Sequence, residues 1–97
     1  MTNKDRQKAV PTVQIDNERA LVTEWRFAPG AETGWHMHNM DYIVVPGTSG
    51  NLLIESSSGN AVSQLQQGVS YTRSAGVEHN VVNDNDEEFV FVEIELR

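Results

Sequence analysis

The chain has 97 residues, a formal net charge of −7 and no cysteine, and this length suits one domain with one modest core. The acidic balance argues against nucleic acids and anionic membranes as partners, and the lack of cysteine excludes disulfides and thiolate metal sites. No apolar run approaches the ~20 residues of a membrane span, and the first ten residues are polar rather than signal-like. The sequence therefore indicates a cytoplasmic protein.

The chain begins with a polar segment, residues 1–10, that we expect to be flexible, and we place a single domain on residues 11–97. The first expected strand is 12–16. The next lies in "ALVTEWRFAPG", where Leu21, Thr23, Trp25 and Phe27 share one parity. Because alternate residues of a strand point to opposite faces, these four side chains form one face of the expected strand. Trp25 and Phe27 are candidates for the core.

The rest of the chain alternates in the same way, between glycine and asparagine turns. The further expected strands are 34–38, 41–46, 51–55, 61–65, 68–73, 79–82 and 88–96. No stretch of ten or more residues carries a helical stripe of apolar side chains. Many short strands at this spacing predict an all-β sandwich or barrel.

The last expected strand, 88–96, is apolar on both faces. We expect its longer aliphatic set to point inward, namely Val90, Val92, Ile94 and Leu96. Phe89 and Phe91 would then lie outside, where two exposed phenylalanines make a patch that soluble monomers seldom tolerate. The pattern therefore predicts a homodimer.

Histidine is rare in this sequence and its placement is uneven. The chain has three histidines, of which His36 and His38 are two residues apart and His79 follows in a later strand. On a strand, residues two apart point to the same side about 6.5–7 Å apart, which suits two imidazoles that bind one ion. A third imidazole from a neighbouring strand would complete the set. Surface histidines are common as well, so the spacing by itself leaves both interpretations open.

The sequence around these histidines resembles a known family. "GAETGWHMH" (30–38) has the form G-x5-H-x-H, and "GVSYTRSAGVEHNVVN" (68–83) has the form G-x5-S-x-G-x2-H-x3-N. These segments resemble the two halves of the cupin signature, with Ser74 where the family usually has proline. The resemblance implies a small double-stranded β-helix, or jelly-roll, barrel. It also implies one divalent metal at the barrel mouth and maps His36, His38 and His79 onto its ligands.

One expected ligand is missing from the pattern. The family's usual fourth ligand is a glutamate whose place falls here on Tyr42 or Ile43. Asp41 is the nearest carboxylate, but it lies one position early and its side chain is one methylene shorter. Asp41 stays a candidate metal ligand, with a hydrogen bond to an imidazole or simple surface exposure as alternatives. A site of three histidines is the preferred interpretation.

Two further residues near the motifs are candidates for work on a ligand. Tyr42 is the candidate catalytic residue, as a hydrogen-bond donor or as a base, although a tyrosine on a half-buried strand can be purely structural. Arg73 could hold an anionic substrate if its strand points it inward. The alternative for Arg73 is an outward arginine in a surface ion pair.

The resemblance implies a metal-dependent function without fixing the reaction. The first hypothesis is an Fe(II) dioxygenase that oxidises a small organic acid, although zinc, nickel and manganese also suit nitrogen ligands. The second is a metal-containing barrel that binds or senses a small molecule without catalysis. The third is a lyase or isomerase of a small acid, in which the metal or the histidines assist proton transfer.

Overall fold

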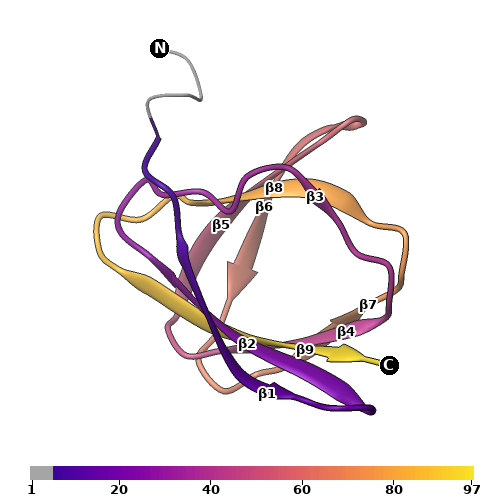
Figure 1. Ribbon diagram of the computed structural model, residues 1–97. Coiled ribbons are helices and arrows are strands. Elements are labelled where there is room, and N and C mark those ends of the chain that lie inside the picture. Colours follow the sequence, from indigo (N-terminus) through magenta and orange to yellow (C-terminus); the bar gives the residue numbers. More distant parts are fainter. Residues whose placement is uncertain (1–5) are drawn as a thin grey trace.

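Two β-sheets face each other in the computed structural model, which describes residues 6–97 (Figure 1). Within these residues the strands are β1 (Val10–Asp16), β2 (Ala20–Phe27), β3 (His36–Met37), β4 (Tyr42–Pro46), β5 (Gly50–Ser56), β6 (Gly59–Leu65), β7 (Tyr71–Arg73), β8 (Glu78–Asn83) and β9 (Phe89–Leu96). The described part of the chain contains no helix of the length and apolar character needed to cross a membrane.

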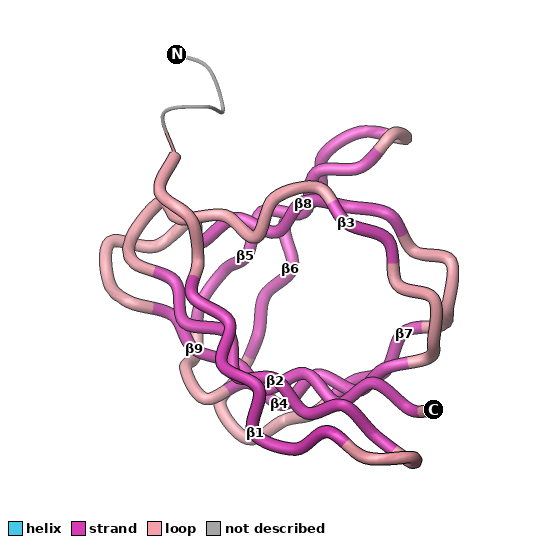
Figure 2. Tube along the Cα trace, in the orientation of Figure 1, coloured by secondary structure: helices cyan, strands magenta, loops and turns pink. Residues whose placement is uncertain are grey.

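The strand order places chain segments from both halves of the sequence in each sheet. One sheet has the order β1-β2-β9-β4-β7 and the other the order β3-β8-β5-β6. The paired strands are antiparallel, and the chain crosses between the two sheets repeatedly (Figure 2). The expected all-β fold, a single double-stranded β-helix barrel, is confirmed.

The core lies between the sheets and follows the alternation of the strands. In β2, Thr23 and Phe27 are buried and Arg26 is exposed, as the period of two predicts. Trp25 packs against the same core. The larger buried apolar side chains are Phe27, Tyr42, Val44, Leu52, Leu65, Val81, Phe89 and Phe91.

Strand β9 has the opposite orientation to the one expected. Phe89 and Phe91 are 0% and 5% exposed and point into the barrel, whereas Leu96 on the other face is 44% exposed. The prediction of an inward aliphatic face was therefore wrong. The phenyl rings fill the space between the sheets better than the smaller aliphatic groups, and Phe91 packs on Phe27 with ring centroids 5.4 Å apart.

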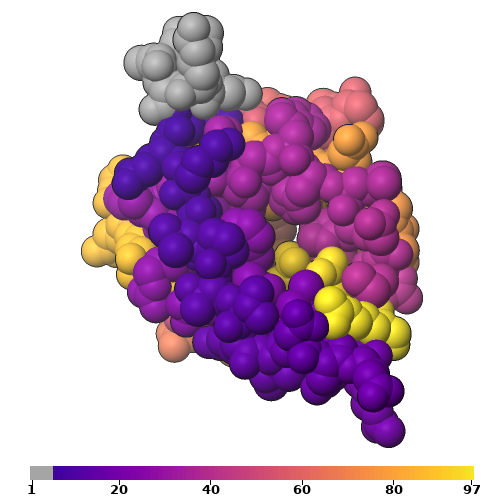
Figure 3. Space-filling view, in the orientation of Figure 1, coloured from indigo at the N-terminus to yellow at the C-terminus, as the bar shows by residue number. Residues whose placement is uncertain are grey.

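The N-terminal segment lies against the barrel before β1 begins. Residues 1–5 of the expected flexible stretch lie outside the described residues. From Arg6 on, the chain is held: the N–H of Ala9 donates to the carbonyl of Glu32 at 2.8 Å, and the N–H of Glu32 donates to the carbonyl of Gln7 at 2.9 Å. Figure 3 shows this indigo segment lying along one side of the molecule.

Candidate metal centre

The two motif segments meet because β3 pairs with β8. His36 lies directly opposite His79 in this antiparallel pair, and His38 follows one residue after β3 ends. The ring centroids lie 4.8 Å apart for His36 and His38, 4.7 Å for His36 and His79, and 5.3 Å for His38 and His79. One ring nitrogen from each lies within 4.8 Å of the other two. The structure thus gathers the three histidines of the chain in one cluster.

Oxygen acceptors determine which nitrogen of each ring carries the proton. Nδ1 of His36 lies 2.8 Å from the carbonyl oxygen of Gly34, and Nδ1 of His38 lies 3.4 Å from a carboxylate oxygen of Glu95. A carbonyl or carboxylate oxygen only accepts, so both Nδ1 atoms are donors. In a neutral ring, Nε2 then presents a lone pair.

The geometry of these two Nε2 atoms fits a metal ion. They lie 3.1 Å apart. Two ligand atoms about 2.1 Å from one ion, at a right angle to each other, are about 3.0 Å apart. Two lone pairs at such a distance repel each other unless a cation lies between them. The cluster of His36, His38 and His79 could therefore bind a divalent metal ion.

The surroundings keep two of the imidazoles neutral, which metal binding requires. Burial, followed by the charges of His36 and His38, lowers the pKa of His79 to about 4. Burial and the charge of His36 also lower the pKa of His38, against the opposing effect of Glu95. These two rings are therefore already neutral at neutral pH, and they can bind a metal without first releasing a proton.

Tyr42 packs directly on one ring of the histidine cluster. Its ring stacks on the ring of His38 with centroids 3.9 Å apart and an interplanar angle of 23°. Burial, with a smaller effect from Glu93, raises the pKa of Tyr42 to about 12. The hydroxyl therefore stays protonated at neutral pH and can donate a hydrogen bond. It is poorly suited to act as a base.

The imidazoles line a cavity of about 380 Å³ between the two sheets. Its apolar walls come mainly from Val44, Leu52, Ile54, Val77, Val81 and Phe91. Arg73 also lines the cavity, because it pairs with Tyr42 across β4 and β7 and shares its side of the sheet. The guanidinium carbon of Arg73 lies 4.7 Å from the ring centroid of Tyr71. Arg73 thus adds an exposed positive charge to an otherwise largely apolar cavity.

Comparison with known proteins identifies the family. The sequence-family model described as a cupin domain matches residues 23–95 of this chain. This chain belongs to the cupin family. The beta-alanine degradation protein BauB of Pseudomonas aeruginosa is 58% identical to this cupin over 92 residues, which span 95% of this chain and 97% of that protein.

Solved structures agree with this assignment. A cupin domain from Bordetella pertussis Tohama I superposes with a TM-score of 0.95 at 67% identity, and the match covers 96% of this chain and 97% of that one. A double-stranded β-helix domain from Klebsiella pneumoniae has a TM-score of 0.75 at 23% identity, covering 92% and 76%. The second likeness shows the fold alone.

Asp41 stands apart from the histidines of this cupin. It is exposed, and its Oδ1 accepts a hydrogen bond from the backbone N–H of Ala75 at 2.8 Å. Its side chain therefore holds the turn between β7 and β8. Among the described residues, Asp41 belongs to neither of the two clusters that could hold a metal. This position corresponds to simple surface exposure, which was one of the alternatives for Asp41 in the sequence analysis.

Two glutamates of β9 also approach the histidine cluster. The sequence analysis did not connect them with this site. Glu93 and Glu95 form a second cluster with His38, and Glu93 Oε2 lies 3.9 Å from Nε2 of that ring. We refer to Glu93, which lines the cavity, and Glu95, which contacts His38, as the β9 carboxylates. Burial, followed by the charge of Glu95, raises the pKa of Glu93 to about 7. The available signal was their parity with Phe89 and Phe91, which becomes informative only when that face is known to point inward.

Proposed function

We propose that this cupin binds one divalent transition metal ion per chain through His36, His38 and His79 and acts on a small organic acid in its cavity. The observation that carries the proposal is the pair of Nε2 lone pairs 3.1 Å apart, with both Nδ1 protons directed to oxygen atoms. Such an arrangement is favourable when a cation is present and unfavourable without one.

The metal that best serves an oxidation is Fe(II), with zinc, nickel and manganese as other ions that suit imidazole ligands. Bound Fe(II) would supply the redox chemistry that lets dioxygen oxidise a small acid. With three protein ligands, positions remain open toward the cavity. The site is then that of a dioxygenase-like cupin.

The chain's own residues indicate what kind of molecule the cavity takes. The positive charge of Arg73 suits a carboxylate, and the apolar walls suit a short carbon chain and exclude water. The protonated hydroxyl of Tyr42 can donate a hydrogen bond to a bound oxygen atom. The name of the relative BauB, which refers to degradation of β-alanine, supports a small amino acid or an acid derived from one as the ligand.

The test is metal analysis of protein purified without oxygen, followed by oxygen uptake with Fe(II)-loaded protein. β-Alanine, propionate and short hydroxy- and oxo-acids form the panel. We expect about one metal ion per chain and oxygen consumption that depends on one of the acids. Absence of bound metal would contradict the proposed site. Tight binding of an acid without turnover would instead favour a binding or sensor barrel, and conversion without oxygen uptake would favour a lyase or isomerase.

We also propose a homodimer, now through the outer face of the β1-β2-β9-β4-β7 sheet. Ile15, Val22, Ile94 and Ile43 lie side by side on four neighbouring strands of this sheet. Ile15 is 49% exposed and the other three are half-buried. An apolar row of this kind is typical of a surface that a second copy covers.

Sedimentation at tens of micromolar checks the dimer against the chain mass of 10.8 kDa. Ile94→Glu places a charge in the apolar row and should give a folded monomer, whereas Gln64→Glu, at an exposed position of the other sheet, should leave the dimer intact. A wild-type monomer would contradict the proposal. Phe89→Glu is expected to unfold the chain because this ring is buried.

A further inference from the structure

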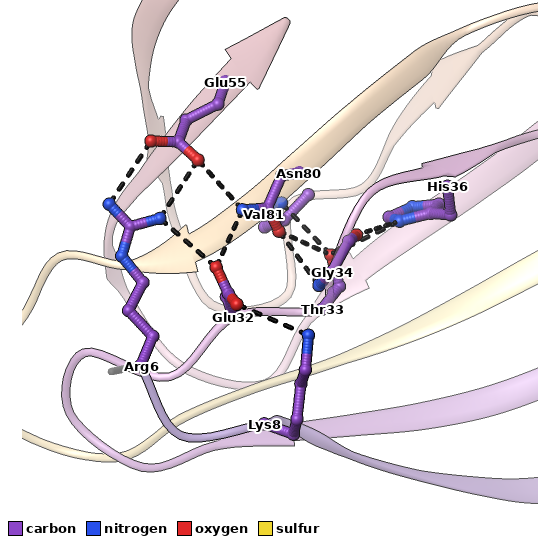
Figure 4. Close-up of polar contacts among 9 residues, drawn as sticks. All are labelled: Arg6, Lys8, Glu32, Thr33, Gly34, His36, Glu55, Asn80 and Val81. Atoms are coloured by element: carbon purple, nitrogen blue, oxygen red, sulfur yellow. Dashed lines mark hydrogen bonds and ion pairs between the residues drawn. The ribbon is translucent and has the colours of Figure 1, made fainter. Parts of the chain in front are cut away.

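A second polar cluster lies beside the metal centre, where the N-terminal segment meets the barrel (Figure 4). We call it the Asn80 network and define it as Arg6, Glu32, Glu55 and Asn80. Glu32 and Glu55 are 5% and 8% exposed. Arg6 donates to both oxygens of Glu55 at 3.0 and 3.2 Å and to Oε1 of Glu32 at 3.3 Å. One guanidinium thus offsets the repulsion between two buried carboxylates.

Both carboxylates are held in the ionised form. Burial acts to raise the pKa of Glu32, but hydrogen bonds from Asn80, Arg6 and Lys8 outweigh it and leave this pKa below its usual range. The hydrogen bond from Arg6 lowers the pKa of Glu55, also against burial. An ionised carboxylate has no hydrogen to donate, so both groups act only as acceptors.

This restriction determines how the Asn80 amide is oriented. The side chain is 1% exposed, and its Nδ2 donates to Oε1 of Glu32 and Oε1 of Glu55, each at 2.9 Å. The amide NH₂ has to face the two acceptors, so the amide oxygen faces the opposite way. There, Oδ1 accepts a hydrogen bond from the backbone N–H of Gly34 at 2.9 Å.

The Gly34 peptide carries this orientation to the metal centre. Gly34 has a φ of 89°, a left-handed conformation that other residues rarely adopt. Its N–H is held by Asn80, and its carbonyl oxygen accepts the Nδ1 proton of His36 at 2.8 Å. Thr33 supports the same segment, because its hydroxyl accepts the N–H of Val81 at 3.1 Å. Figure 4 shows the contacts running from Arg6 through Asn80 to His36.

We propose that Arg6 and Asn80 are positioning residues for the metal centre: they hold the Gly34 peptide so that His36 keeps its proton on Nδ1 and presents Nε2 to the ion. The inference rests on the proposed metal site and adds residues outside the two histidine motifs. Direct hydrogen-bond partners of a ligand typically change metal affinity 10–100-fold when they are removed, and Asn80 and Arg6 act on His36 through such a partner, the carbonyl of Gly34.

Loss of Arg6 has a defined consequence in this arrangement. Without the guanidinium, Glu32 and Glu55 repel each other in a buried place, so one of them takes up a proton. A protonated carboxyl can donate to the Asn80 oxygen, and the amide is then free to turn. A turned amide presents NH₂ to the N–H of Gly34, donor against donor. The Gly34 peptide shifts, and His36 loses its fixed tautomer.

The first test is the tautomer of His36 in metal-free protein at pH 7.5, measured by ¹⁵N–¹H NMR with labelled histidine. Wild type should show His36 protonated on Nδ1, and Arg6→Met should show a mixture of tautomers. Arg26→Met is the matched control, since Arg26 pairs with Glu88 on the exposed surface. A folded Arg6→Met protein with the wild-type tautomer would overturn the proposal, because a purely structural role changes stability without changing the tautomer.

The second test is the affinity for Co²⁺, measured by competition with a chelator. Arg6→Met should bind Co²⁺ roughly tenfold more weakly than wild type, with Arg6→Lys in between and Arg26→Met unchanged. Equal affinity of Arg6→Met and wild type would count against the proposal. If Arg6→Met does not fold, Glu55→Gln takes its place, because it removes one of the two carboxylates that orient the Asn80 amide. If wild type binds no Co²⁺, the proposed function fails, while the tautomer still decides the role of Arg6.

Discussion

The barrel holds two pairs of glutamates whose surroundings differ: Glu32, Glu55 and Glu93 are buried, whereas Glu95 is only partly buried. In the Asn80 network, Glu32 and Glu55 receive hydrogen bonds from a guanidinium and an amide, and their pKa values are lowered. Of the β9 carboxylates, Glu93 forms no hydrogen bond within residues 6–97, and its pKa is raised to about 7. Burial favours the protonated form of each carboxylate, and only the pair with enough hydrogen-bond donors overcomes this effect and stays ionised. The first pair is closed by the chain itself, whereas in the second, which we call the open pair, Glu95 accepts from His38 and Glu93 is open to a ligand.

The largest effect is expected from removing the imidazoles beside the open pair. His36→Ala combined with His38→Ala should abolish metal binding, measured by metal analysis and chelator competition. The metal-free protein should remain folded, because the change removes the repulsion between two facing lone pairs. Asp41→Asn is the control and should keep the metal. Full occupancy in the double variant would contradict the assignment of the site.

The closed pair should be sensitive to loss of its cation. Arg6→Met should cost about 2–3 kcal/mol of unfolding free energy at pH 7, because it leaves two buried carboxylates without their partner. In wild type, the lowered pKa values stabilise the fold above about pH 4.5, and this contribution disappears as the pH falls through the lowered values. The gap between the two proteins should therefore narrow from pH 7 to about pH 3.

Urea unfolding at several pH values measures this gap. Arg26→Met, which removes an exposed ion pair, should change the unfolding free energy little at any pH. A constant difference between Arg6→Met and wild type across the range would show that Arg6 acts through packing rather than through the charges of Glu32 and Glu55.

For the open pair, the stability of the fold should depend on pH in the opposite direction. The pKa of Glu93 is raised from 4.5 to about 7, so between these values the unfolded chain releases a proton that the fold retains, and stability decreases as the pH rises. Glu93→Gln should therefore stabilise the metal-free protein by about 1–3 kcal/mol at pH 8 and by almost nothing at pH 4. Glu87→Gln, at an exposed position, is the control. A gain at both pH values would point to a packing effect.

The smallest effect is expected for the exposed cation at the cavity. Arg73→Met should weaken binding of a small carboxylic acid by roughly tenfold, which corresponds to about 1.4 kcal/mol. Binding of the corresponding amide should change little, since it lacks the negative charge. Calorimetry with both ligands measures the two affinities. Equal losses of affinity for the acid and the amide would show that the charge of Arg73 does not contribute to binding.

The parts of this structure that depend on local pattern were predictable from the sequence. The alternation of apolar residues predicts the strands, and the two glycine-framed motifs predict that His36, His38 and His79 meet. Both features depend on residues close together in the chain or on a family pattern that spans two segments. The position of Asp41 depends instead on a backbone turn, which the spacing alone does not determine.

The orientation of β9 and the Asn80 network were not predictable in this way. A strand that is apolar on both faces carries no sign of which face points inward, and the choice depends on the space between the sheets. That choice also decides whether Glu93 reaches the cavity and Glu95 reaches His38. Arg6 and Glu55 are 49 positions apart, so their contact exists only after both sheets have formed. The polar N-terminal residues carry no sequence pattern that indicates this contact.

The short length of β3 has a consequence for the motion of the site. Two of the proposed ligands lie in or beside a strand of two residues, and their segment is tied down by a few bonds, such as the one from the N–H of His38 to the carbonyl of Val77 at 2.9 Å. A segment with so few ladder bonds opens more easily than the long strands around it. Its amide hydrogens should exchange with solvent early in the metal-free protein. A bound ion would link this segment to β8 and slow that exchange, so occupancy of the centre can be followed as local protection.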